Sequence, residues 1–441
     1  MSDSVPLRKS LGLTSAIMIT VGSVIGSGIF YKPLDVAQSM PGPWSIYALW
    51  ISLGLVCLCG ALAYAELGAM MPGAGGQYTF LREAWGQPIA FLFAWCYFLV
   101  INTGTMSALG VAFTMGVESL LAVKLGKPAA LGCAAGMILL LAAVNSVGVR
   151  WGALLQNVTT FAKIGSLLMI VVGALLSSAP ETVTSAPAPA FALSGLVAAS
   201  VAIFWAYEGW HQLPFSAAEL KRPTRDLPLG LIFGLLILIA LYLVVNGAYF
   251  SLVPVGEMRG MTKEIEVPAA AVGRIFGGTG MMILSAMVCL SVFGAANPNM
   301  LSSARGLSTV ARDGLAPKSL THIHTRWQTP IVAIWAQAAW AIVLIYVMKE
   351  FRDLTDFVVF VALIFYGLTV AAVYRLRRSR PDTPRPHRCL GYPLTPAVFI
   401  AAVLFVDTHR LFDADNRQNA LIGLGILCAG LPVWLLIRKR A

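Results

Sequence analysis

The sequence contains few charged residues for its length. Asp, Glu, Lys and Arg make up 12% of its 441 residues, whereas roughly a quarter of an ordinary soluble domain is charged. It also lacks the polar linkers that join separate cores in a soluble chain of this size. Short polar breaks instead separate apolar runs of about 20 residues, the length at which a helix spans a bilayer. The composition therefore excludes a soluble multidomain protein and predicts an all-α integral membrane protein.

The chain also lacks the patterns of a metal centre or an active site. Its seven cysteines show no metal or disulfide spacing, and His322 and His324 have no further ligand nearby, so we expect a solvated loop there. No His-rich metal set, Asp-x-x-Asp pair or nucleophile elbow occurs. These absences argue against a membrane enzyme, and we expect no metal and no cofactor.

Twelve apolar runs are predicted to be transmembrane helices. They cover residues 12–38, 44–66, 87–120, 129–148, 153–177, 192–214, 228–252, 278–308, 330–348, 354–374, 393–410 and 419–437. The first run follows Arg8 and Lys9, but it is too long for a secretory signal and lacks an Ala-x-Ala-like exit. We therefore expect an uncleaved helix.

Positive residues set the predicted orientation, because cytoplasmic segments carry an excess of Lys and Arg. With a cytoplasmic N-terminus, the inside segments hold Arg8, Lys9, the cluster from Arg375 to Arg388, and Arg438 to Arg440. Both termini are therefore predicted to be cytoplasmic. The net charge of +11 follows largely from this asymmetry and does not require nucleic acid. The segment 375–388 could contact anionic headgroups, although a solvated loop is the simpler interpretation.

The first run contains the stretch TVGSVIGSGIF at 20–30, in which glycine occupies positions 22, 26 and 28. Each glycine costs a helix interior about 1 kcal/mol relative to alanine. In hydrocarbon, irregular backbone is tolerated only where it lines a cavity or is buried in protein. The stretch therefore indicates either a discontinuous helix around a polar ligand or close helix packing of the small-xxx-small kind.

A second interruption favours the discontinuous helix. The sixth run contains FWAYEGWHQLPF at 204–215, which places Glu208, Gly209, His211 and Pro214 in an apolar segment. A charged residue there costs about 2.5–3.5 kcal/mol and normally faces a cavity or a partner. The first and sixth helices are five apart, and matched interruptions in two halves are typical of transporters built from inverted repeats.

The ends of interrupted helices expose backbone groups of opposite polarity. Where the first helix resumes, near Ser27, Gly28 and Ile29, free N–H groups and the positive helix end favour an anion. Where the sixth helix stops, near Trp205, Ala206 and Glu208, free carbonyl groups suit an ammonium ion. A site for a carboxylate that faces a site for an ammonium group describes an amino acid.

Eight motifs follow one another along the chain. They are GSVIGSGIF (22–30), PGAGGQYTFLREAWG (72–86), QNVTTFAK (156–163), FWAYEGW (204–210), ELKRPTRDLP (219–228), NGAYF (246–250), SSARGLSTVARDGLAPKSL (302–320) and RPHRCLGYPLTPAVFI (385–400). In this order they resemble the amino acid–polyamine–organocation superfamily, closest to bacterial relatives of the L-type amino acid transporters.

The resemblance covers almost the whole chain and implies a LeuT-like fold. It implies one transporter domain over residues 1–441 with twelve transmembrane helices, of which helices 1 and 6 are discontinuous. The two inverted five-helix repeats would cover about 12–177 and 192–374, and two additional helices about 393–437. The protein would work by alternating access in a bacterial inner membrane.

The resemblance also implies roles for residues of the two breaks. In the family the Gly-Ser-Gly break binds the substrate α-carboxylate, which corresponds here to Gly26, Ser27, Gly28 and Ile29. Carbonyl groups of both breaks hold the α-amine, which points to Val24, Trp205 and Glu208, with Ala206 and Gly209 in the same break. Trp205 also occupies the outer-gate position, for which the alternative is a lipid-facing or core tryptophan.

Lys163 lies about ten residues from either end of the fifth run, roughly 15 Å deep at 1.5 Å per residue, too deep to snorkel easily. One interpretation is an ammonium group that bonds to buried carbonyls and holds helices together. In relatives, a lysine at this position occupies the place of the second sodium ion of sodium-coupled members and bridges helix one, near Gly22, and helix eight, near Ser291. Tyr242 corresponds to a helix-seven position that communicates with this lysine in bacterial relatives. The resemblance implies sodium-independent transport, by exchange or by proton-linked uptake.

Glu208 departs from the pattern, because eukaryotic L-type members have glycine there while some bacterial members have an acid. We favour a tether of the broken helix over a substrate contact, and His211 is also unusual. The expected substrate is a small or medium neutral L-amino acid. The alternatives are a cationic amino acid or polyamine if Glu208 faces the pocket, or a transporter-like nutrient sensor, although sensors usually add a soluble extension.

Eukaryotic L-type subunits attach to a heavy chain through a cysteine in the loop between helices three and four. Here that loop reads AVKLGKPAA at 122–130 and contains no cysteine. We therefore expect no disulfide-linked heavy subunit. The expected partners are an amino acid substrate and membrane lipids.

Overall fold

The computed structural model describes residues 9, 11–73, 75–147, 149–177, 186–262, 265–347, 351–412 and 417–438. Arg8, Arg440 and positions 148, 348 and 439, which belong to the sequence predictions above, lie outside the described residues. Within these ranges all regular secondary structure is helical, apart from a bridge between Leu11 and Leu220.

Helices occupy each of the twelve predicted runs. They are α1 (Leu13–Val24), α2 (Gly28–Ser39), α3 (Pro43–Met70), α4 (Gly76–Trp85), α5 (Gln87–Cys96), α6 (Asn102–Leu121), α7 (Lys127–Ser146), α8 (Val149–Leu176), α9 (Leu193–Ala206), α10 (Pro223–Leu252), α11 (Val255–Arg259), α12 (Glu266–Phe276), α13 (Gly280–Arg312), α14 (Ile331–Val347), α15 (Phe351–Ser379), α16 (Leu394–Phe412) and α17 (Arg417–Arg438). Four short helices complete them: the π-helix η1 (Tyr97–Ile101) and the 3₁₀ helices η2 (Trp210–Glu219), η3 (Gly277–Thr279) and η4 (Lys318–Thr321).

Among the described residues, nine helical stretches are long and apolar enough to cross a membrane. The count becomes ten if α1 and α2, which bend by 48° at their break, form one span. The shorter helices α9 and α14 contain 14 and 17 residues. The all-helical membrane architecture is therefore confirmed, whereas twelve crossings and the inverted repeat stay predictions.

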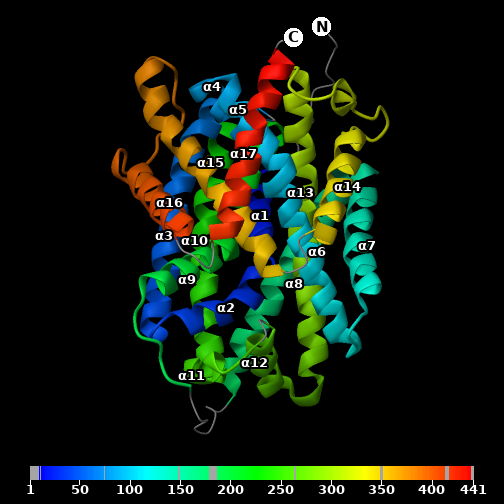
Figure 1. Cartoon of the computed structure of the whole chain (residues 1–441), viewed down its shortest axis with the longest axis vertical. Helices are drawn as coiled ribbons and strands as arrows, with labels where there is room; N and C mark the ends of the chain where they lie inside the picture. The colour runs from blue at the N-terminus through cyan, green and yellow to red at the C-terminus, as the bar shows by residue number, and fades with distance from the viewer. Residues whose placement is uncertain are drawn as a thin grey trace.

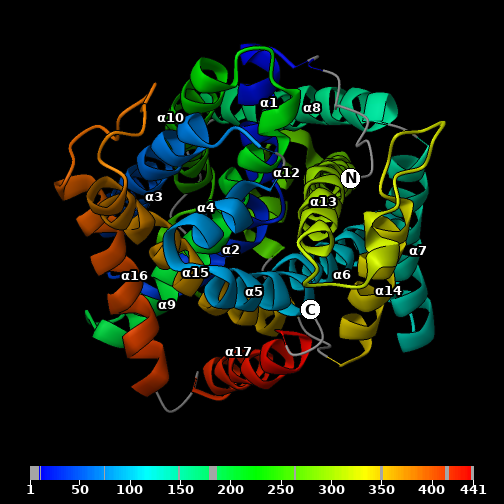
Figure 2. The ribbon, with the colours of Figure 1, turned by 90° about the horizontal axis from the view of Figure 1, so that it is seen from above.

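The helices form an elongated bundle with two distinct ends (Figure 1). One end carries α4 and the end of α17, and we call it the α4 face. The opposite end carries α11 and α12, and we call it the α11 face. Seen from above, α7, α14, α16 and α17 lie at the rim, while α2, α6 and α13 lie nearer the middle (Figure 2).

The backbone is interrupted at both stretches that the sequence singled out. The helix α1 ends at Val24 because Ile25 takes an extended conformation with φ −67° and ψ 95°, and α2 begins three residues later. The helix α9 ends at Ala206, and Gly209 has φ +121°, which favours glycine. The 3₁₀ helix η2 follows and packs against α4.

Candidate functional site

The two breaks lie against each other. A Cβ atom on Gly28 would lie 2.4 Å from the Cα atom of Ala206, and a Cβ atom on Gly209 would lie 2.5 Å from the carbonyl oxygen of Ser23. Both distances are shorter than real Cβ contacts. Glycine at these two positions therefore allows the broken backbones to approach each other.

A cavity lies where the breaks meet. Its lining residues are Ser23, Val24, Gly26, Ser27, Gly28, Thr105, Leu109, Trp205, Glu208, Gly209, Ala295 and Asn299. Its volume is about 20 Å³, enough for about one water molecule. The cavity must therefore widen before even the smallest amino acid can enter.

Most of the residues predicted for the substrate site come together in this lining. Val24, Gly26, Ser27, Gly28, Trp205, Glu208 and Gly209 line the cavity. Ile29 and Ala206 do not line it, although both are fully buried beside it in α2 and α9. The lining is thus built largely from backbone-rich segments of two interrupted helices.

The interrupted helices leave backbone groups without helical partners near the cavity. The first N–H groups of α2 have no carbonyl one turn earlier in the same helix, and the side chain of Ser27 makes no capping hydrogen bond. On the carbonyl side, the Tyr242 hydroxyl donates to the carbonyl oxygen of Ala206 at 2.9 Å and lies 3.3 Å from the carbonyl oxygen of Val24. Tyr242 of α10 therefore joins the two breaks directly.

Trp205 covers the cavity on the side of the α11 face. Its indole Nε1 donates to Ser27 Oγ at 3.2 Å, so the side chain spans from α9 to the first break. The edge of its ring meets Phe351 of α15, with ring centroids 5.9 Å apart. Trp205 is 5% exposed and packs inside the protein, so it does not face lipid.

The Glu208 side chain points to α15 and takes part in a buried polar network. The Tyr366 hydroxyl donates to Glu208 Oε1 at 2.6 Å and lies 2.9 Å from His211 Nδ1. His211 Nε2 lies 3.1 Å from Gln212 Nε2, which donates to Asn299 Oδ1 at 2.6 Å. The network thus connects the second break to α15 and α13.

Lys163 of α8 lies beside the first break. Its Nζ donates to the carbonyl oxygen of Gly22 at 2.9 Å, and the side chain is 1% exposed. Gly294 of α13 lies close to the same side chain, because an added Cβ there would lie 2.8 Å from Lys163 Cε. The Ser291 hydroxyl instead donates to Gly26 at 3.0 Å. Lys163 therefore binds a carbonyl group in the last turn of α1, whereas Ser291 binds one in the break that follows.

The sequence interpretation missed Ser23 of α1 and four lining residues that lie outside both breaks. These four are Thr105 and Leu109 of α6 and Ala295 and Asn299 of α13. The spacing of four residues within each pair puts both members on one helix face. Three of the four are small or apolar, so nothing in the sequence distinguishes them from helix-packing residues.

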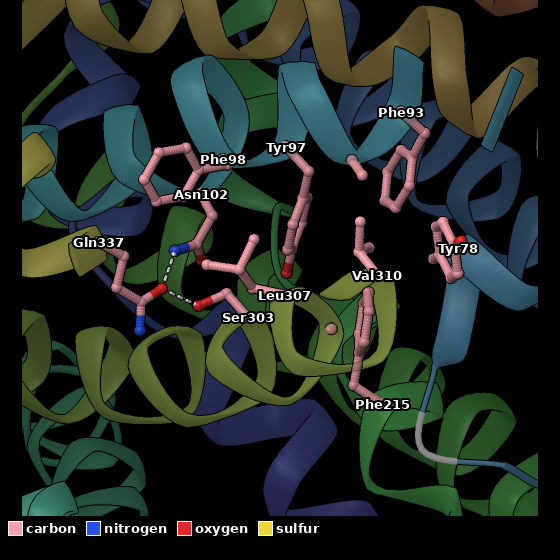
Figure 3. A pocket seen from close by; sticks show the side chains of 12 residues that line it. Tyr78, Phe93, Tyr97, Phe98, Asn102, Phe215, Ser303, Leu307, Val310 and Gln337 are labelled. Atoms are coloured by element: carbon pink, nitrogen blue, oxygen red, sulfur yellow. Dashed lines mark hydrogen bonds between the residues drawn. The ribbon is translucent and has the colours of Figure 1, made fainter. Parts of the chain in front are cut away.

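A second cavity, of about 10 Å³, lies between η1, η2, α13 and α14 (Figure 3). On one side the Asn102 amide donates to Gln337 Oε1 at 3.0 Å, and the Ser303 hydroxyl donates to the same oxygen. On the other side the rings of Tyr97 and Phe215 stack with centroids 5.5 Å apart. These rings pack η1 against η2.

A wider cavity, of about 70 Å³, lies between α1, α8, η2 and α13. Its polar lining residues are Ser15, Gln156, Asn157, Ser216, Glu219, Asn297, Ser302 and Arg305. Arg305 Nη2 lies 2.6 Å from Glu219 Oε1, and the Leu11–Leu220 bridge lies next to this ion pair in the chain. A polar space therefore lies between the first break and the α4 face.

The sequence profile of the family described as "Amino acid permease" matches residues 11–415. The chain belongs to the amino acid permease family. It is a multi-pass membrane transporter of amino acids and not an enzyme, as the sequence predicted.

Individual relatives agree with this assignment. The chain is 30% identical over 437 residues to the serine/threonine exchanger SteT of Bacillus subtilis (strain 168), with 98% of each chain covered. It is 33% identical over 390 residues to the human b(0,+)-type amino acid transporter 1, covering 86% of this chain and 78% of the relative. It is 32% identical over 447 residues to the large neutral amino acids transporter small subunit 2 of Oryctolagus cuniculus, covering 98% and 81%.

Proposed function

We propose that the protein transports small to medium neutral L-amino acids without sodium, by alternating access around the cavity between the two breaks. The observation that carries this proposal is the meeting of two interrupted helices at one cavity. In such a site the first N–H groups of α2 bind the substrate carboxylate. Carbonyl groups near Val24, Trp205 and Glu208 bind its ammonium group.

The size and chemistry of the cavity lining support a substrate with a small neutral side chain. Leu109 and Ala295 are apolar, and Thr105 offers one hydroxyl group. Glu208 accepts the Tyr366 hydroxyl, so its carboxylate already has a partner on α15. A serine/threonine exchanger among the relatives agrees with this substrate class.

Lys163 supports sodium independence. Its ammonium group binds the Gly22 carbonyl and places a fixed positive charge beside the first break. A cation that bound there would meet this charge and would compete for the same carbonyl groups. Transport then proceeds by exchange of amino acids or by proton-linked uptake.

The surroundings of the cavity support alternating access. On the α11 face, Trp205 and Phe351 cover the cavity, whereas a wider polar cavity lies toward the α4 face. We propose that the α4 face is cytoplasmic, as the positive residues predict, and that the membrane is a bacterial inner membrane. The loop between α6 and α7 contains no cysteine, which supports a transporter without a disulfide-linked heavy subunit.

Purified protein in proteoliposomes tests the proposal. Vesicles loaded with unlabelled serine should take up labelled serine saturably, and replacement of sodium by choline should leave the rate unchanged. Vesicles without internal amino acid separate exchange from proton-linked uptake. Exchange requires an amino acid inside the vesicle, whereas proton-linked uptake responds to an imposed pH gradient. Uptake that requires sodium, or no saturable uptake of any neutral amino acid, would overturn the proposal.

A further inference from the structure

Charged and aromatic side chains join α2 to α15 near the α11 face. We call this group the outer cluster, and it consists of Lys32, Asp35, Phe351, Arg352 and Thr355. Lys32 Nζ donates to Asp35 Oδ2 at 3.1 Å and to Thr355 Oγ1 at 3.3 Å. Arg352 Nη2 donates to Asp35 Oδ1 at 2.6 Å. Asp35 is therefore shared by two cations from two helices.

The outer cluster lies next to Trp205, the side chain that covers the cavity on the side of the α11 face. Lys32 follows Gly28 by one helical turn, so it lies on the same face of α2, one layer farther out. Its ammonium group lies 5.1 Å from the centre of the Phe351 ring, within the range of a cation–π contact. The same ring meets the edge of Trp205 at 5.9 Å. Phe351 thus connects the charges to the side chain that covers the site.

The contacts between α2 and α15 are made by side chains. The two helix backbones are not closely packed against each other. The side chain of Arg352 is 58% exposed, whereas Lys32 and Asp35 are 2% and 10% exposed. A buried charge that loses its only partner destabilises a protein strongly. Lys32 and Asp35 avoid this cost because they are paired within one helix.

We propose that the outer cluster is a reversible ion-pair lock that closes the α11 face of the transport path, with Lys32 and Asp35 as its positioning residues. This inference rests on the proposed function. When the start of α15 moves away, Arg352 passes into water and Thr355 leaves Lys32, while the Lys32–Asp35 pair persists. Opening therefore leaves no buried charge without a partner, and closing restores two polar contacts over the site.

Kinetics measured separately from the two membrane faces test the lock. Asp35→Asn and Arg352→Gln remove the pair between the helices, and right-side-out and inside-out vesicles report KM from each face. Apparent affinity scales with the population of the competent state, so a weaker lock should lower KM from the α11 face and raise KM from the α4 face, each by about threefold or more. Asp35→Glu keeps both cations paired and should restore the parent values.

A matched control shows whether the effect belongs to this cluster. Glu257→Gln removes another ion pair near the α11 face, to Arg274 at 2.8 Å, that does not involve α15. It should leave both KM values unchanged. Equal changes of KM from the two faces, or unchanged KM values in Arg352→Gln, would overturn the lock.

Thiol labelling tests the same inference without requiring transport. Thr105→Cys places a thiol in the central cavity, in a background where the seven native cysteines are replaced by alanine or serine. A membrane-impermeant maleimide applied from the α11 face should label this thiol several-fold faster when Arg352→Gln is added. An unchanged labelling rate would overturn the lock. Absence of serine transport by the parent protein, with labelling still faster in Arg352→Gln, would refute only the proposed function.

Discussion

Lys163 Nζ and the carbonyl oxygen of Gly22 lie 2.9 Å apart, which joins the middle of α8 to α1 two residues before α1 ends. The contact places the Lys163 amino group at a carbonyl group that the interruption leaves without a helical donor. Both partners are buried. The position of α8 and the shape of the first break are therefore coupled.

Replacing Lys163 by alanine should slow turnover at least about tenfold, because a hydrogen bond from a charged group is typically worth about 1.5–3 kcal/mol. The measurement is serine exchange in proteoliposomes at matched protein content. Ser166→Ala is the control, because the Ser166 hydroxyl bonds within α8 to Ala162 and should not matter. Full turnover in Lys163→Ala would remove the role that we give to this charge.

Alanine at Gly28 should abolish transport. The added methyl group would meet the backbone of α9 at Ala206, and overpacking of this kind costs about 1–3 kcal/mol. Serine uptake is the measurement. Gly165→Ala is the control, because an added Cβ at Gly165 meets nothing within 4 Å. If Gly28→Ala transports like the control, the two breaks do not need to touch.

Trp205 variants should weaken substrate retention in two steps. Phenylalanine keeps a ring against Phe351 but loses the hydrogen bond to Ser27, which predicts a KM increase of about two- to tenfold. Alanine removes the cover as well and should raise KM further. Equal KM values in both variants and in the parent protein would show that Trp205 does not cover the bound substrate.

Glu208→Gln distinguishes a tether from a substrate contact. Glutamine can still accept the Tyr366 hydroxyl, so the tether predicts serine KM within about threefold of the parent. Tyr366→Phe leaves Glu208 without its strongest partner and should reduce serine transport more. If Glu208→Gln instead abolishes inhibition by lysine or by a polyamine, the side chain contacts a cationic substrate and the alternative specificity is correct.

The sequence predicted the helices well because a bilayer imposes long apolar runs. The bounds of α3, predicted at 44–66 and found at Pro43–Met70, differ by only a few residues. Gly26, Glu208 and Gly209 were identifiable because glycine and charge are costly in an apolar segment.

Other features depended on contacts between distant segments. Thr105 and Asn299 enter the cavity from α6 and α13, and only the packing of those helices reveals it. Asp35 and Arg352 are separated by 317 positions, so no local pattern connects them. The helices α11 and α12, between predicted runs, were likewise not predicted.

The central claim is that the backbone at the two breaks binds an amino acid, and an experimental structure with serine bound tests it most directly. The account predicts the serine carboxylate within hydrogen-bond distance of N–H groups between Gly26 and Ile29. It predicts the ammonium group at carbonyl groups of Val24, Trp205 or Glu208. Serine bound elsewhere, for example at Arg305 in the cavity near the α4 face with the central cavity unaltered, would contradict the account.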